Sequence, residues 1–486
     1  MIPKDKKLIL ALKMLVLIFV LYRIFSLDIY AVTPNDSIRY LREAVSNTYF
    51  SDPLQIVQLR GFKFPGYPIY LSIWHNIAPF LPLDGLTLMA LSQRLLLAAS
   101  LVWLLFNMGF FSVPLLLFYS SNTFLAQSNI IYTEGMTIPL AILFSISMVS
   151  VYRLRNKDNL LRNFKLWLLL GLLLLTFILL VLTKLTHAAF ALPLLMLGFT
   201  IKQHGYKFKL KKTKLAWPVT VLIIALSVYT FAVSIDNKKQ FGKFTPIMGH
   251  ERLLYFGLWN QVFFIHPENI DKPELAEFYD NGSPYVFLHR IDKVCDGIFD
   301  FPCTAPFHKQ RTSELLAKSK LSLTTERIRT AITGLLGGQK TELNVWREGI
   351  LKANGQPYSI TTWHSNWYID KYGMKKYLDD YNRGETPRVL RGLSDSEKII
   401  GKIGVNATRL MQAIMTVMAI TMLGWFVFKR KIGFHTVYVY SFVAFFVFIV
   451  ALSSGLMDLW RFIIPCWSIF IVCAFYAVPE SWKTKQ

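Results

Sequence analysis

Long uninterrupted apolar runs are the feature that most constrains this chain. Several approach or exceed the roughly 18 to 20 residues that an α-helix needs to cross a bilayer. Inside hydrocarbon the backbone polar groups of each segment must be satisfied internally, which a helix does. The pattern therefore predicts an all-α polytopic membrane protein.

The basic residues indicate which side of the membrane each loop occupies. The chain has 53 Lys and Arg against 30 Asp and Glu, a net charge of +23. In a soluble protein this excess would suggest nucleic acid, but here it lies in short stretches between apolar runs, as the positive-inside rule predicts. Arg153–Lys165 and Lys202–Lys214 are assigned to the cytoplasm, and Lys429–Lys431 and the C-terminal tail agree. No nucleic-acid partner is predicted.

The topology that follows has about ten crossings with both termini in the cytoplasm. The first apolar run is not followed by a small-residue cleavage site, so it is predicted to be a retained span. The segment 64–82 would reverse the sidedness of the later loops if it crossed. Prolines near both of its ends favour an interfacial or re-entrant helix on the outer face. The predicted spans are 8–26, 88–106, 110–127, 135–152, 166–183, 188–202, 215–233, 407–428, 434–452 and 462–478.

Three parts follow from this topology. Residues 1–233 form an N-terminal transmembrane bundle with a first outer loop at 28–87, residues 234–406 form an outer domain, and residues 407–486 supply the closing helices. The outer domain is large enough for a small core of its own and contains a helical stretch at Ser313–Leu336. Its Trp363 and Trp367 could stack on a sugar or anchor the loop at the lipid interface.

The cysteines bear on the compartment. Cys295 and Cys303, in "CDGIFDFPC", are close enough in sequence to close a small disulfide loop. An oxidising compartment such as the bacterial periplasm would suit that pair. Two free thiols are the alternative.

Ionisable residues gather at the outer ends of the predicted spans. At a membrane edge such residues are costly unless they are paired or hydrated, so they are functional candidates by default. A carboxylate among cations at one face fits a reaction in which a lipid phosphate leaves and a hydroxyl attacks. The carboxylate accepts the proton, and Lys and Arg stabilise the departing phosphate. The candidates are Asp36, Glu134, Lys184, His187 and Arg461, with Arg60 and Lys63 beside the proposed re-entrant helix.

Each candidate also has a structural explanation. Asp36 could be only the N-cap of the helix that begins after it, and Glu134 could be a solvated loop acid. Lys184 and Arg461 could extend to lipid headgroups. His187 could be a polar residue whose hydrogen bonds are satisfied within the fold. It could also join Asp36 and Glu134 in binding a divalent cation, but no metal-ligand spacing is visible, so no cofactor is assigned and a metal is left open.

Five segments in order resemble the landmarks of GT-C glycosyltransferases, which use lipid-linked sugars. The nearest pattern is the branch that contains protein O-mannosyltransferases and the aminoarabinose transferase of lipid A. The resemblance covers the first spans and the last one, but not the outer domain. The segments are "TPNDSIRYLREA", "RGFKFPGYPIYLSIW", "SNIIYTEG", "LTKLTHAAFALPLL" and "WRFIIPCWSIFIVCAFY".

The resemblance implies a GT-C-like bundle and a role for each matched position. Asp36 matches the first-loop acid that acts as a base or organises the site, and Glu134 matches the acid of the second outer loop. The basic positions near the lipid phosphate are Arg60, Lys63, Lys184 and Arg461. The chain departs from the pattern in lacking a second acid beside Asp36 and in having "KF" before its Pro-Gly, so substrate and metal dependence stay open.

Sidedness narrows the donor. Nucleotide sugars are made in the cytoplasm, so an outer site needs a polyprenyl-phosphate sugar and an acceptor that is also outside. Size and architecture are similar to those of phage-type O-antigen glucosyltransferases, which implies inverting transfer of a hexose, glucose, from undecaprenyl phosphate to O-antigen of lipopolysaccharide at the bacterial inner membrane. The alternatives are a polysaccharide polymerase or ligase and, less favoured, a transporter of lipid-linked sugar.

Overall fold

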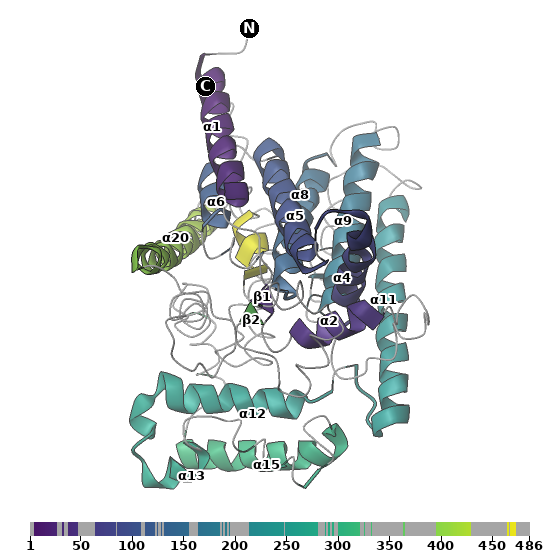
Figure 1. The fold of residues 1–486 in the computed structure, drawn as a ribbon, viewed down its shortest axis with the longest axis vertical. Helices are drawn as coiled ribbons and strands as arrows, with labels where there is room; N and C mark the ends of the chain where they lie inside the picture. Colours follow the sequence, from purple (N-terminus) through teal and green to yellow (C-terminus); the bar gives the residue numbers. More distant parts are fainter. Residues whose placement is uncertain are drawn as a thin grey trace.

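The structure is a computed structural model of the 486-residue chain. Figure 1 shows a bundle of long helices above a separate layer of shorter ones. The residues that the structure describes are 4–26, 32–33, 37–46, 64–83, 85–107, 112–121, 124, 128, 131–154, 164–184, 187, 190–191, 194, 213–246, 248–279, 287, 290–291, 294–295, 300–320, 325, 332, 363–364, 395–428, 464–465 and 467–472.

The bundle contains helices at most of the predicted spans. Within the described residues, three are long and apolar enough to cross a membrane, and they fall in α5, α8 and α9. This supports the prediction of a helical membrane protein. The remaining long helices, α1, α11 and α20, include the spans predicted at 8–26, 215–233 and 407–428. The bundle helices are α1 (Lys4–Ser26), α5 (Gly85–Asn107), α6 (Ser112–Tyr119), α8 (Glu134–Leu154), α9 (Phe164–Thr183), α11 (Thr213–Phe241) and α20 (Asp395–Phe428).

Two helices continue past the predicted domain boundaries. Helix α11 extends to Phe241, beyond the boundary at 233, and α20 begins at Asp395, before the boundary at 406. Hydropathy marks where a helix meets water, whereas backbone hydrogen bonds can continue into a polar stretch. The predicted spans 188–202 and 434–452 lie mostly or wholly outside the described residues.

Helices α1 and α5 run antiparallel, and two hydrogen bonds each join the middle of one helix to the last turns of the other. Lys13 Nζ donates to the carbonyl oxygen of Leu105 (3.2 Å), and Arg94 donates to that of Ile24 (2.8 Å). Helix α8 is the most enclosed of the three candidate membrane helices and packs against both α5 and α9. Its inner position puts any polar group at its ends into a buried environment.

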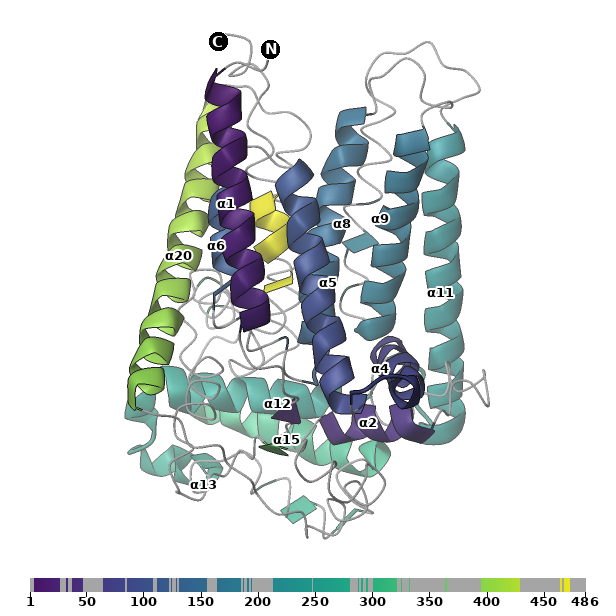
Figure 2. The ribbon, with the colours of Figure 1, turned by 45° about the horizontal axis from the view of Figure 1, so that its top comes forward.

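Two short helices cover one end of the bundle. Helix α4 (Gly66–Ile77) and a 3-10 turn (Ala78–Phe80) fall within the segment predicted as interfacial or re-entrant, and α2 (Ser37–Ser46) packs against α4. At 12 residues α4 is about 18 Å long, too short to cross about 30 Å of hydrocarbon. Figure 2 shows α2 and α4 at the end of the bundle that faces the helical layer.

The helical layer is made of α12, α13 and α15 with the turns between them, and it crosses that end of the bundle (Figure 2). Its core includes Tyr255, Trp259 and Leu315. The elements are α12 (His250–Asn260), a π-helical turn (Gln261–Ile265), two 3-10 turns (Pro267–Asn269 and Pro273–Leu275), α13 (Ala276–Tyr279) and α15 (Phe301–Ser319).

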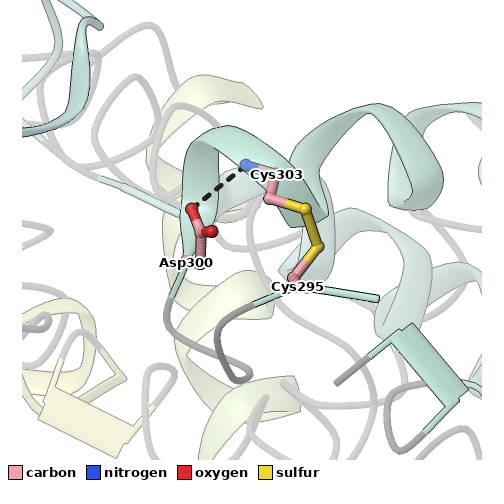
Figure 3. The surroundings of a disulfide bond; sticks show 3 residues. All are labelled: Cys295, Asp300 and Cys303. Carbon is pink, nitrogen blue, oxygen red and sulfur yellow. Dashed lines mark hydrogen bonds between the residues drawn. A yellow bond between two sulfur atoms is a disulfide. The ribbon is translucent and has the colours of Figure 1, made fainter. Parts of the chain in front are cut away.

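Helix α15 overlaps the helical stretch predicted at 313–336 and begins before it, while most of 321–336 lies outside the described residues. It begins at Phe301 because Asp300 caps it, accepting a hydrogen bond from the Cys303 amide (3.2 Å). It ends at Ser319 because Lys320 has a left-handed backbone (φ 54°). Figure 3 shows Cys303 also bonded to Cys295, so a disulfide closes the loop in front of α15.

A short antiparallel pair connects the first outer loop with the distant aromatic segment. Strand β1 (Val32–Thr33) pairs with β2 (Trp363–His364), with Val32 opposite His364 and Thr33 opposite Trp363. This pairing brings together segments that are more than 300 residues apart.

Candidate functional site

An ion pair joins the start of α8 to the end of α9. Glu134 is the first residue of α8, and Lys184 directly follows α9. The Lys184 Nζ lies 2.5 Å from Glu134 Oε1, with exposed side-chain fractions of 13% and 1% respectively. A helix N-terminus favours an anion and a C-terminus a cation, so the antiparallel helices place each charge at the end that stabilises it. Both residues were predicted site residues, and the structure puts them in direct contact.

The burial of this ion pair distinguishes it from an ordinary surface salt bridge. Removing two charges from water is costly, and replacing a buried pair by apolar residues is often neutral or stabilising. Stability alone therefore does not explain why the chain keeps it. Ionisable groups held in this way at a membrane edge are functional candidates.

His187 lies near the ion pair, and its Nε2 is available as a hydrogen-bond acceptor. Its Nδ1 is 3.0 Å from the Leu180 carbonyl oxygen, and its amide donates to the carbonyl oxygen of Lys184. Because a carbonyl only accepts, Nδ1 carries the proton. The buried Nε2 has no hydrogen-bond partner among the described residues and is left as an acceptor. The ring is in contact with Phe190.

Gln93, in α5, links α4 to the start of α8. Its Oε1 accepts a hydrogen bond from the Tyr67 hydroxyl (2.8 Å), and its Nε2 donates to the Ser128 carbonyl oxygen (3.0 Å). A Cβ at Gly135 would lie 2.1 Å from Gln93 Oε1, so only glycine lets the amide pack against the residue that follows Glu134. Gln93 is thus held by two hydrogen bonds against the first turn of α8.

The start of α4 is also held against the end of α9. A Cβ at Gly66 would lie 2.7 Å from the Leu182 carbonyl carbon, so the two backbones approach more closely than any side chain would allow. Lys184 follows two residues later. The short helix, predicted from its prolines, therefore packs directly beside the charged end of α9.

A narrow, mainly apolar cavity lies behind Glu134 in the bundle. Its polar lining comes from Ser128 and Glu134. The residues around it are Leu97, Phe124, Ser128, Glu134, Gly135, Ile138 and Pro139.

The remaining predicted residues are distributed as follows. Asp36, Arg60, Lys63, Arg461 and Trp367 lie outside the described residues. Trp363 contributes its backbone to β2. Cys295 and Cys303 form the disulfide of the helical layer.

The part of the chain that the structure describes contains no group of three or more His, Cys, Asp or Glu side chains that could hold a metal ion. Of the three residues predicted as potential metal ligands, Glu134 and His187 interact electrostatically, and Asp36 is outside that part. Among the described residues, these two supply one carboxylate already bound to a lysine and one imidazole nitrogen, which do not make a metal site by themselves.

Sequence reasoning missed Tyr67, Gln93 and Arg94. Arg94 is fully buried in α5 and holds the last turn of α1, after which the loop with Asp36 begins. The adjacent Gln and Arg in "LSQRLLL" were the available signal, because two strongly polar residues within a predicted span are functional candidates.

Comparisons with known proteins were made for the whole chain. No family model matches it, and no curated protein matches it. Among solved structures it is similar to ArnT from Cupriavidus metallidurans bound to undecaprenyl phosphate, with 12% identity and a TM-score of 0.33 over 98% of this chain and 78% of that one. At this similarity neither fold nor activity can be transferred, so the function is argued from the residues of the site.

Proposed function

We propose that this protein is a membrane glycosyltransferase that moves a hexose from a polyprenyl phosphate to an acceptor hydroxyl. The observation that carries the proposal is the Glu134–Lys184 pair with His187 beside it, at the end of a bundle of membrane-length helices. A carboxylate, an ammonium and an acceptor nitrogen in one buried place are the groups that this transfer needs.

The transfer is a single displacement at the anomeric carbon. The acceptor oxygen forms a bond to that carbon, while the bond from the carbon to the phosphate oxygen breaks and its electron pair leaves with the polyprenyl phosphate. The acceptor hydroxyl proton goes to a carboxylate, and the anomeric configuration inverts. Lys184 stabilises the negative charge on the departing phosphate.

Other predicted residues complete the site in this proposal. Asp36 is the general base, and Glu134 is the second carboxylate. Arg60, Lys63 and Arg461 add positive charge at the lipid phosphate. His187, Trp363 and Trp367 contact the sugar or the acceptor, the first through Nε2 and the others through their rings.

The finer assignment follows from sidedness. With the basic loops in the cytoplasm, the site faces the periplasm of a bacterial inner membrane, within a GT-C-like bundle of about ten spans and beside a periplasmic helical domain. The donor is then undecaprenyl phosphate glucose and the acceptor is O-antigen.

The direct test is transfer of labelled glucose from undecaprenyl phosphate glucose to isolated O-antigen by the purified protein. Wild type is compared with Asp36→Asn and Lys184→Met, and Lys318→Met, which removes an exposed lysine of the helical layer, serves as the control. We expect transfer by wild type and the control and at least a hundredfold loss in the other two, the usual scale for a general base or a phosphate ligand.

The other results would redirect the proposal. Undiminished transfer by Asp36→Asn would move the base to Glu134. Extension of O-antigen chains with lipid pyrophosphate release, in place of single-sugar transfer, would indicate a polymerase. Failure of wild type to transfer any polyprenyl-phosphate sugar would overturn the proposed function.

A further inference from the structure

The Glu134–Lys184 pair joins the phosphate ligand of the proposed function to its second carboxylate. Lys184 cannot give its full charge to a phosphate while it holds Glu134, and Glu134 is less available to a hydroxyl proton while it accepts a hydrogen bond from Lys184. The structure therefore shows a cation and a carboxylate of the candidate site bound to each other.

The two side chains differ in how freely they can leave. Glu134 is 1% exposed and lies at the first turn of α8, where the helix N-terminus favours its charge even without a partner. Lys184 is 13% exposed, lies just past the end of α9, and has a long flexible side chain. Lys184 is the partner that an incoming anion can reach and the one that can move.

Bridging both anions at once is the less favourable arrangement. Lys184 has three N–H donors, so it could in principle hold the phosphate and Glu134 together. A phosphate placed that close to a buried carboxylate would be repelled strongly, because the surroundings screen charge poorly. Movement of Lys184 toward its exposed side separates the two negative charges.

Resting on the proposed function, we infer that Lys184 exchanges partners: it leaves Glu134 for the phosphate of the lipid donor and so releases the Glu134 carboxylate. The Oε1 position that Lys184 leaves can then accept a hydrogen bond from the acceptor hydroxyl only when donor is bound. Glu134 thus acts as a donor-controlled group, and the donor binds before the acceptor.

The test is the affinity for undecaprenyl phosphate, measured in nanodiscs without any sugar transfer. If Lys184 must leave Glu134 to bind phosphate, Glu134→Gln removes the competitor and tightens binding about tenfold. Glu134→Asp keeps the charge but shortens the side chain, so it should tighten binding by a smaller factor. It also serves where Glu134→Gln folds poorly. Glu277→Gln, which breaks an exposed pair, should leave the affinity unchanged.

A double-mutant cycle separates exchange from a general effect of charge. In the Lys184→Met background, phosphate binding should be weak, and adding Glu134→Gln should no longer tighten it. Equal tightening in both backgrounds would mean that Glu134 repels phosphate without Lys184 being involved. Weaker or unchanged binding by both Glu134 variants would mean that Lys184 holds both anions at once. Either result overturns the exchange and leaves the proposed function standing, whereas absence of binding by wild type would remove the lipid donor itself.

Discussion

The bundle and the helical layer each contain a Lys–Glu ion pair, and the two pairs differ mainly in burial. In the bundle, Glu134 and Lys184 are 1% and 13% exposed. In the layer, Glu277 and Lys318 are 53% and 44% exposed, and they join α13 to α15. Water screens the Glu277–Lys318 pair, so this pair contributes little to stability. Removing one partner of the Glu134–Lys184 pair leaves the other charge in a buried place. A Lys–Glu pair is thus only a local contact in the helical layer, whereas in the bundle it determines the charge of the candidate site.

The largest expected effect comes from removing one partner of the buried pair. Glu134→Gln or Lys184→Met should each lower the free energy of unfolding by about 3–5 kcal/mol, because each removes an oppositely charged partner from a buried charge. The double variant Glu134→Gln/Lys184→Met should recover most of that loss. Denaturant unfolding in a mild detergent measures all three. Losses below about 1 kcal/mol would place this pair in the same class as the exposed one.

This contrast also shows which parts of the site were predictable. Glu134, Lys184 and His187 were found from topology, since a polar residue at the end of an apolar run is conspicuous. Their pairing was not predictable, because it depends on the antiparallel contact of α8 with α9, and sequence spacing carries no such information.

The same limit applies elsewhere in the fold. The short helix α4 was predicted from its prolines and the parity of the charged loops. Gln93 was hidden within a span, since its role comes from Tyr67 and Ser128, which approach only after the helices pack. The limits of α15 depend on a capping aspartate and a single left-handed lysine, which hydropathy cannot locate.

The second-largest effect is a loss of stability of the helical layer in acid, which we expect from His308. His308 is 1% exposed and lies near the rings of Tyr255, Phe256 and Phe287. Burial, and then the charge of Arg252, lowers the pKa of His308 to about 4, while Glu251 opposes the shift.

The sign of the pH dependence follows from that shift. Because the folded state binds the His308 proton less readily than the unfolded state, stability is complete above the ordinary pKa of about 6.5 and falls as the pH drops toward 4, by up to about 3 kcal/mol. The pKa of Glu277 is also lowered, mainly by its hydrogen bond to Lys318, and its contribution is lost only below its ordinary value of 4.5.

Hydrogen exchange of α12 and α15 between pH 7 and pH 4.5 measures this loss of stability. His308→Phe keeps an aromatic ring in place without a titrating group, so its exchange should no longer change over that pH range through this residue. The same acid sensitivity in both proteins would assign it to another group.

The third effect tests how closely the bundle packs around the site. Gly135→Ala would place a methyl group 2.1 Å from Gln93 Oε1 and displace an amide that makes two hydrogen bonds. We expect a loss of about 1–3 kcal/mol in stability, the range for overpacking. Gly171→Ala, in α9, is the matched control, because a Cβ there meets nothing within 4 Å. A similar response of the two variants would show that Gln93 can move without cost.

The smallest effect on stability is expected from breaking the exposed Glu277–Lys318 pair. Glu277→Gln and Lys318→Met should each change the free energy of unfolding by about 0.2–1 kcal/mol, because solvent screens the charges and both long side chains lose freedom when they pair. Lys318 also lies over the Phe278 ring (5.3 Å), so its loss should exceed that of Glu277. Raising the salt from 0.05 to 1 M should reduce the wild-type advantage further, while the buried pair, which is screened less by solvent, should respond less. If the exposed pair proved as costly to break as Glu134–Lys184, burial would not be what distinguishes them, and the argument for a functional role of the inner pair would lose its basis.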